Sequence, residues 1–209
     1  MTMRAFLRAL RNLLWGNPVE EPGRQLRVLS TAVADHRMTM EPSERSTSMN
    51  MAYEKLMQHF DEREIRYLAD GEGQRVYADF TGEAGAYRIV AVVDVEAEVF
   101  HVFGCPSVRI PEGARPAIAE TVARANHKLM VGKFEMDYDA GEWYFQASQV
   151  LTDDGLEDRV IDRLMGVTMT MLDTYLPAVL SVIYGNELPA DAVRCVEAGL
   201  RNRGEQEST

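Results

Sequence analysis

The sequence predicts an α+β fold built on one antiparallel sheet, and three observations support this prediction. Residues 66–108 hold several runs rich in β-branched and aromatic side chains, separated by glycine-containing turns, which is typical of consecutive antiparallel strands. Two further runs after residue 132 are joined by Asp139-Ala140-Gly141, a hairpin signal, because glycine supplies the positive φ that such turns need. Segments with apolar residues at helical spacing precede and follow both groups of strands. The predicted order is therefore α-β-β-β-α-β-β-α.

In the first half of this domain a helix precedes the strands. Apolar residues at helical spacing predict a helix from about Met51 to Glu62, and Ser46, Thr47 and Ser48 each suit its N-cap. The strands are expected at 74–82, 86–95 and 99–108, with an additional short strand at 66–69.

The second half alternates helices with the hairpin. Its elements are expected at 111–129 (helix), 133–137 and 142–151 (hairpin strands), 158–184 (long helix) and 189–201 (short helix). Pro116 falls in the first turn of its helix, where a missing N–H is tolerated. Gly132 is expected to end the helix before the hairpin in a left-handed cap. Pro177 is expected to bend the long helix.

The chain is expected to divide into four parts. These are a basic amphipathic helix at 1–16, a linker at 17–47, the α+β domain at 48–186, and a short helix with a polar tail at 187–209. The linker is mixed and polar and contains three prolines. The N-terminal part differs in charge from the rest of the chain: residues 1–28 carry a net charge of +3, whereas the whole chain carries −11. This asymmetry predicts a separate role for the N-terminus.

The N-terminal helix has one apolar stripe with arginines on the opposite side. Its candidate docking residues are Arg4, Phe6, Leu7, Arg8, Leu10, Arg11, Leu14 and Trp15. Such a helix suits a groove on its own domain or on a partner protein, and it equally suits the surface of an anionic membrane. At this length an isolated helix is marginal in water, so disorder is a third alternative.

Composition argues against several functional classes. The net charge of −11 disfavours nucleic-acid binding, which needs a basic footprint. Cys105 and Cys195 lie far apart, and no CxxC or His-rich spacing predicts a metal site. No phosphate loop or dinucleotide fingerprint predicts a cofactor. Without an apolar run of about 18 residues, a cytoplasmic location is expected, peripheral at the membrane if the N-terminal helix binds lipid.

The C-terminal half holds a motif made of Asn126, Gly132, Phe134, Glu135, Asp137, Tyr138, Asp173, Tyr175, Leu176 and Pro177. With this motif the chain resembles the YbjN family of bacterial sensory transduction regulators, over about residues 51–185. The resemblance implies a fold similar to that of type III secretion chaperones, and a homodimer.

The long helix at 158–184 is apolar over most of its circumference. A helix of this kind buries more than one side, and a single small sheet covers one, so a second subunit is expected to cover the rest. The candidate dimer or partner surface comprises Met165, Met169, Leu172, Tyr175, Leu176, Val179, Leu180 and Ile183. The methionines have two readings, as core fillers and as an adaptable binding surface.

These observations favour a non-enzymatic protein-binding module, a chaperone-like or regulatory adaptor that acts as a homodimer and binds a further protein. The alternative is a small-molecule or phospho-ligand enzyme that uses His127 with nearby carboxylates. A cleft that places His127 within hydrogen-bond reach of a carboxylate would favour the enzyme. An apolar groove would favour the adaptor.

Overall fold

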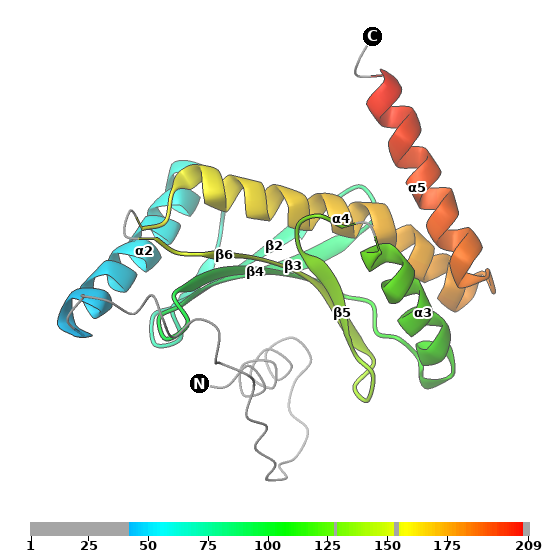
Figure 1. Cartoon of the computed structure of the whole chain (residues 1–209), viewed down its shortest axis with the longest axis horizontal. Coiled ribbons are helices and arrows are strands. Elements are labelled where there is room, and N and C mark those ends of the chain that lie inside the picture. Colours follow the sequence, from blue (N-terminus) through cyan, green and yellow to red (C-terminus); the bar gives the residue numbers. More distant parts are fainter. Residues whose placement is uncertain (1–41, 128, 153–154, 207–209) are drawn as a thin grey trace. The chain divides into compact units, whose positions relative to one another are not determined.

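The computed structural model describes residues 42–127, 129–152 and 155–206 (Figure 1). Four helices, a short 3-10 turn and six strands make up this part of the chain. In chain order they are α2 (Pro42–Glu62), β1 (Leu68–Asp70), β2 (Arg75–Thr81), β3 (Ala86–Asp94), β4 (Val99–Pro106), η2 (Glu112–Ala114), α3 (Arg115–Asn126), β5 (Lys133–Asp137), β6 (Glu142–Val150), α4 (Asp158–Tyr184) and α5 (Pro189–Gln206).

The six strands form one sheet in the order β1-β2-β3-β4-β6-β5, and all neighbours are antiparallel. The predicted α+β class is confirmed, and the additional short strand is β1. The sheet is a meander as far as β4. The chain then passes through α3 to the edge strand β5, and β6 returns between β5 and β4.

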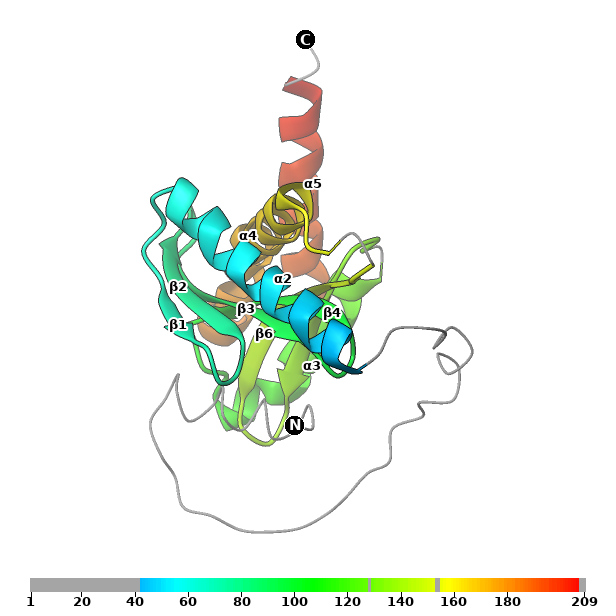
Figure 2. The same ribbon diagram turned by 90° about the vertical axis from the view of Figure 1, so that its left-hand side faces the viewer.

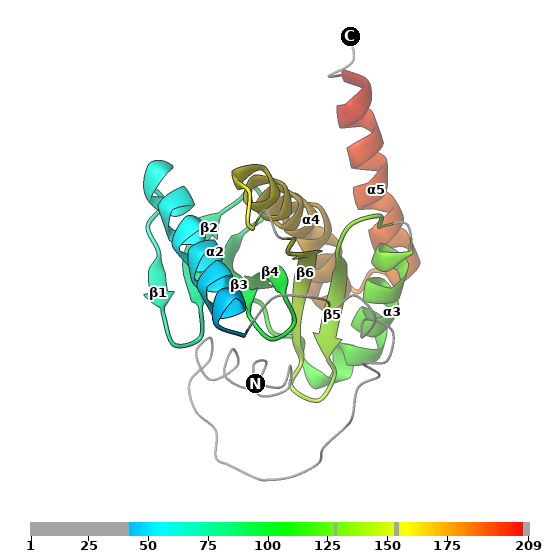
Figure 3. The ribbon, with the colours of Figure 1, turned by 60° about the vertical axis from the view of Figure 1, so that its left-hand side comes forward.

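The main core lies between the sheet and the helices, with α2 and α4 over the same face of the sheet (Figures 2 and 3). Each helix contributes buried residues to this one cluster, for example Leu56 of α2, Ile118 of α3 and Val193 of α5. Strand residues of the same face complete it, among them Ile89 and Phe100. The alternation of side chains along each strand thus directs one set of residues toward α4.

Helix α4 has the predicted bounds and continues through Pro177. By length and composition it is apolar enough to cross a membrane, but core helices of soluble proteins pass the same test. Here α4 lies across the sheet, and eleven of its residues are buried. These eleven residues of α4 therefore serve the core of this chain.

Several boundaries differ from the predictions. Helix α2 begins at Pro42, so the predicted N-caps at 46–48 are wrong and the linker does not extend to 47. A proline fits a first helical turn because its missing N–H has no intrahelical acceptor there. Helix α5 continues to Gln206, into the predicted polar tail. The predicted N-terminal helix at 1–16 and the rest of the linker lie outside the described residues.

An ionic cluster joins α2 to the start of α4. The ring of His59 is buried, with Nδ1 2.7 Å from an Asp158 oxygen and Nε2 3.1 Å from an Asp162 oxygen. Lys55 places its nitrogen 2.6 Å from an Asp158 oxygen, and Arg63 places one 2.6 Å from an Asp162 oxygen. Asp158 also lies in the first turn of α4, where a negative charge is favoured.

This cluster predicts a pH dependence for the variant Asp158→Asn. Hydrogen bonds from Lys55 and then His59 lower the pKa of Asp158. The stability it contributes is therefore present above the unfolded-state pKa of about 3.9 and is lost as the pH falls through the lower folded pKa. Because the carboxylate is 42% exposed, we expect Asp158→Asn to cost only about 1 kcal/mol at pH 7.

The measurement is urea unfolding of both proteins between pH 7 and pH 2.5. We expect the difference in unfolding free energy to narrow below about pH 4. Glu64→Gln, at an exposed carboxyl group outside the cluster, serves as the matched control. A difference for Asp158→Asn that stays constant over this range would contradict the prediction.

Candidate protein-binding face

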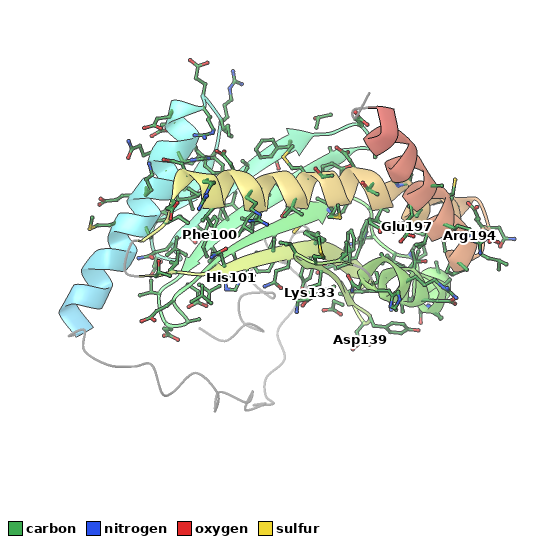
Figure 4. All side chains as sticks on the ribbon, turned by 45° about the horizontal axis from the view of Figure 1, so that its top comes forward. Phe100, His101, Lys133, Asp139, Arg194 and Glu197 are labelled. Atoms are coloured by element: carbon green, nitrogen blue, oxygen red, sulfur yellow. The ribbon has the colours of Figure 1, made fainter. Side chains whose placement is uncertain are left out.

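The sheet has another side, away from α4, that carries both apolar and polar residues. Side chains alternate along a strand, so the partners of the core residues on β3, β4 and β6 gather here. We call this set the second face: Val90, Val92, His101, Phe103, Cys105, Tyr144 and Gln146. Figure 4 labels Phe100 and His101, consecutive residues of β4, the first in the main core and the second on the second face.

The centre of the second face is apolar and buried. Val90 is paired with Phe103 across β3 and β4, and their exposed fractions are 0% and 1%. Neither belongs to the core beneath α4. The ring of Phe103 lies 5.7 Å from that of His101 and 5.9 Å from that of Tyr144. Burial raises the pKa of the Cys105 thiol to about 12, so this thiol stays protonated and unreactive at neutral pH.

A small polar network adjoins this centre. The Nδ1 atom of His101 lies 2.8 Å from the hydroxyl of Ser148, to which the Gln146 amide also donates at 3.1 Å. Burial lowers the pKa of His101, which favours the neutral ring. The Oε1 atom of Gln146 is buried and has no hydrogen-bond partner within the described residues. A buried acceptor of this kind costs about 1–3 kcal/mol unless a donor reaches it.

The edges of the second face carry charge pairs of both signs. Arg88 donates to Asp79 at 2.7 Å and lowers the pKa of that carboxyl group. Lys133 pairs with Glu135, which also accepts a hydrogen bond from the Tyr144 hydroxyl. An apolar centre inside a polar rim is the usual anatomy of a protein interface.

A separate cleft of about 490 Å³ lies between α3 and α5, and Figure 4 shows Arg194 and Glu197 on its α5 side. His127 lines it together with Glu120 and Arg124. The acids are already engaged: Arg124 pairs with Glu120 at 2.7 Å, and Glu197 accepts from a tyrosine hydroxyl at 3.4 Å. In the described part of the chain no carboxylate is hydrogen-bonded to the His127 side chain. The enzyme alternative needs His127 within hydrogen-bond reach of a carboxylate, so the geometry of this cleft does not support it.

The family of the chain follows from its sequence match. The YbjN family model, described as "Putative bacterial sensory transduction regulator", matches residues 52–181, more than half of the chain. The chain belongs to the YbjN family. The prediction from the motif is thereby confirmed. No curated protein matches the chain.

Two solved structures share part of the fold. The crystal structure of YbjN from E. coli aligns with a TM-score of 0.45 at 10% identity, covering 57% of this chain and 84% of that one. A chain of the HopA1-SchA chaperone-effector complex aligns with a TM-score of 0.37 at 16% identity, covering 56% of this chain and 87% of that one. Both TM-scores lie below 0.5.

The residues of the YbjN motif are brought together, and they hold elements in place. Asn126, the last residue of α3, makes two hydrogen bonds with the backbone of Phe134 on β5. Its amide donates to the Phe134 carbonyl at 2.9 Å, and its oxygen accepts from the Phe134 N–H at 2.7 Å. One side chain thus replaces a strand partner and fixes β5 against α3.

Gly132 lets the loop before β5 approach Phe145 and the backbone of Gln146 closely. Its φ is +76°, and a Cβ there would lie 2.6 Å from Cε1 of Phe145 and 2.7 Å from the backbone oxygen of Gln146. The predicted role as a helix cap is wrong, because α3 ends at Asn126 and the loop before β5 intervenes. The left-handed conformation expected of Gly132 is confirmed. Its role is to let the backbone pass close to the Phe145 ring.

The turn between β5 and β6 is formed by the motif carboxylate at its start. Asp137 accepts the N–H of Ala140 at 2.9 Å through its side chain and that of Gly141 at 2.8 Å through its carbonyl. Gly141 has a φ of +67°, as the hairpin interpretation requires. Tyr138 is half exposed beside this turn.

Asp173 attaches α4 to the turn between β2 and β3. It accepts hydrogen bonds from the Ala84 N–H at 2.9 Å and from the Tyr87 hydroxyl at 2.6 Å. Both glycines of this turn pass close to α4: a Cβ on Gly82 would lie 2.7 Å from Cγ of Asp173, and one on Gly85 would lie 2.8 Å from Leu176. Asp173 and Leu176, which lie on one turn of α4, thus both contact the turn between β2 and β3.

The predicted dimer surface on α4 is largely inside the chain's own core. Five of its eight residues are buried, and the other three are partly buried against the core: Met165, Leu172, Tyr175, Leu176 and Val179, then Met169, Leu180 and Ile183. Helices α2, α3 and α5 contribute residues to the same core as α4. The five buried residues are therefore not available to a second subunit in this fold, and the homodimer stays a prediction.

Sequence reasoning missed the second face, although the sequence holds a signal for it. Residues 89–93 of β3 are five consecutive apolar residues, and 143–145 of β6 are three consecutive aromatic ones. A strand that is apolar at successive positions is buried on both sides. The N-terminal docking residues, from Arg4 to Trp15, lie outside the described residues.

Proposed function

We propose that this YbjN-family chain is a non-enzymatic protein-binding module, a chaperone-like or regulatory adaptor that holds a segment of a partner protein against its second face. The observation that carries the proposal is the combination of a buried apolar centre at Val90 and Phe103 with the Gln146 oxygen, which no donor of the described residues reaches. No described helix uses this side of the sheet.

The chemistry of the second face specifies the partner segment. Apolar side chains are needed over Val90 and Phe103, since burial of apolar area is the main favourable term in association. A hydrogen-bond donor is needed opposite Gln146 Oε1. The mixed charges of the rim select the orientation of the segment more than they add affinity. An amphipathic segment with a basic or amide side chain meets all three conditions.

The test is photo-cross-linking from within the native cell, with a photoreactive phenylalanine in place of Tyr77. Tyr77 is half-buried on β2 and pairs with Val90, beside the second face. The matched control places the same group at Tyr184, which is 73% exposed at the end of α4. We expect a specific protein adduct from position 77 and none from position 184.

The captured protein is then purified, and its binding to the full chain is measured. Tyr77→Glu should weaken binding at least tenfold, because it places a charge against an apolar interface, whereas Tyr184→Glu should leave binding unchanged. Equal adducts from both positions, or binding insensitive to Tyr77→Glu, would contradict the proposal. The homodimer, a cytoplasmic location and contact with an anionic membrane are additional proposals that this experiment leaves open.

A further inference from the structure

The two edge strands of the sheet differ in how their outer backbone is covered. β1 and β5 are the outermost strands, and Figure 3 shows them at opposite sides of the sheet. At the β5 edge, the Asn126 side chain makes the two hydrogen bonds with the Phe134 backbone that a further strand would make. Among the described residues no strand lies beyond β1. The β5 edge is therefore capped by α3, whereas the β1 edge is open to strand addition.

The backbone of Ala69 faces outward from the β1 edge. The N–H of Val93 donates to the Gln74 carbonyl, which fixes the alternation of hydrogen bonds between β3 and β2. Followed along the register from β3 to β2 and then to β1, this alternation directs the backbone groups of Leu68 toward β2. Those of the next residue, Ala69, then point away from the sheet, as a donor and an acceptor for another strand.

The side chains at this open edge differ in polarity in a regular order. Leu68 is 66% exposed. Two residues before it, Arg66 is exposed and forms no ion pair within the described part of the chain. Two residues after it, Asp70 is half-buried. Residues two apart lie on the same face of a strand, so one face presents a positive, an apolar and a negative side chain when β1 is lengthened to residue 66.

This order is complementary to itself in the antiparallel direction. If two copies of β1 pair with Leu68 opposite Leu68, Arg66 of each copy lies opposite Asp70 of the other. Tyr67 then lies opposite Ala69, and the backbone groups of both face the other copy. The neighbouring registers that keep this alternation would place Leu68 opposite Arg66 or Asp70. Only the first register pairs apolar with apolar and opposite charges with each other, which stabilises cross-strand pairs.

We propose that the β1 edge pairs with the β1 edge of a second copy, in the antiparallel register that places Leu68 opposite Leu68. The two six-stranded sheets then form one continuous sheet, and the second faces of both copies lie on the same side of it. The pairing itself needs no partner protein. Only one consequence rests on the proposed function, namely that a single partner can contact both second faces.

Disulfide formation by Leu68→Cys tests this register in the full chain, with Cys195→Ser to remove the exposed native thiol. In the proposed dimer the two introduced thiols belong to a non-hydrogen-bonded pair, whose Cα atoms are about 4.5 Å apart and suit a disulfide. Arg66→Cys is the matched control, because the two copies of residue 66 would lie roughly 14 Å apart. On mild oxidation we expect at least tenfold more linked dimer from Leu68→Cys than from Arg66→Cys.

Sedimentation of the full chain tests the pairing without a covalent link. We expect the wild type to dimerise at micromolar concentration. Ala69→Pro removes the outward N–H and is tolerated at an edge strand, so it should keep the fold and dimerise at least tenfold more weakly. Leu68→Lys should weaken the dimer similarly, because it places two positive charges opposite each other. Its control is Val150→Lys on β6, where the native side chain is 65% exposed, and this variant should dimerise as wild type.

Three results would overturn the proposal. The first is equal disulfide yield from Leu68→Cys and Arg66→Cys, and the second is a wild type that stays monomeric throughout the micromolar range. The third is a dimer as tight in Ala69→Pro and Leu68→Lys as in wild type, which would place the interface on another surface. If these results agree with the proposal but cross-linking from position 77 captures only a second copy or nothing, the dimer stands and the adaptor function falls.

Discussion

Phe134→Ala is expected to lower the free energy of unfolding by about 3–5 kcal/mol, the range for truncation of a buried phenylalanine. The Phe134 ring is 3% exposed and lies 4.9 Å from the ring of Phe145, 5.2 Å from Tyr175 and 5.9 Å from Trp143. It therefore joins both strands of the hairpin to α4. Removal of the ring leaves a cavity that three rigid aromatic neighbours cannot fill by collapse.

The measurement is urea unfolding followed by circular dichroism. The control is Met130→Ala, just before the hairpin, where the side chain is 98% exposed and truncation should change stability by no more than about 0.5 kcal/mol. The slope of the transition should stay as in wild type, which would show that the denatured state is unaffected. A loss below about 1 kcal/mol for Phe134→Ala would contradict the packing seen here.

The hairpin and the long helix were predictable because their signals are local. The turn at 139–141 and the strands on each side of it agree with the structure to within one residue. Helix α4 begins at Asp158 and ends at Tyr184, as its apolar repeat predicted. Short-range periodicity and turn chemistry suffice for such elements.

The start of α2 and the surroundings of α4 were not predictable in the same way. Residues 42–50 offer no clear apolar repeat, and their serines and threonines suit several N-cap positions. The packing around α4 depends on where α2, α3 and α5 lie in the tertiary fold, and local sequence patterns do not predict this. An apolar circumference shows that a helix is covered on several sides, but not whether by its own chain or by another.

The candidate site was missed for a related reason. Ile89, Val90, Val92 and Val93 predict a strand by their β-propensity, and their unbroken succession also indicates that both sides of β3 are buried. Whether a donor reaches the Gln146 oxygen depends on the positions of side chains across β4 and β6. No sequence pattern predicts those positions, so the unpaired oxygen in the described part of the chain could not be predicted. Of the motif residues, Asn126 and Asp173 connect elements of the fold.

Gly132→Ala is expected to cost roughly 2–5 kcal/mol, although it adds a single carbon. At a φ of +76° a residue with a Cβ is strained by about 1–2 kcal/mol. The new carbon would also lie 2.6 Å from the Phe145 ring and 2.7 Å from the Gln146 backbone oxygen. Overpacking of this kind adds about 1–3 kcal/mol, because backbone cannot move aside as the end of a flexible side chain can.

Gly155→Ala separates the two causes. Gly155 has a φ of +77°, nearly that of Gly132, but a Cβ there would meet no atom of the described residues within 4 Å. Its substitution should therefore cost only the backbone strain, about 1–2 kcal/mol. The difference between the two variants in urea unfolding then measures the collision with Phe145 and Gln146 alone. Equal losses would show that the loop before β5 relaxes freely, and that close approach of chain to ring is not the reason for a glycine at position 132.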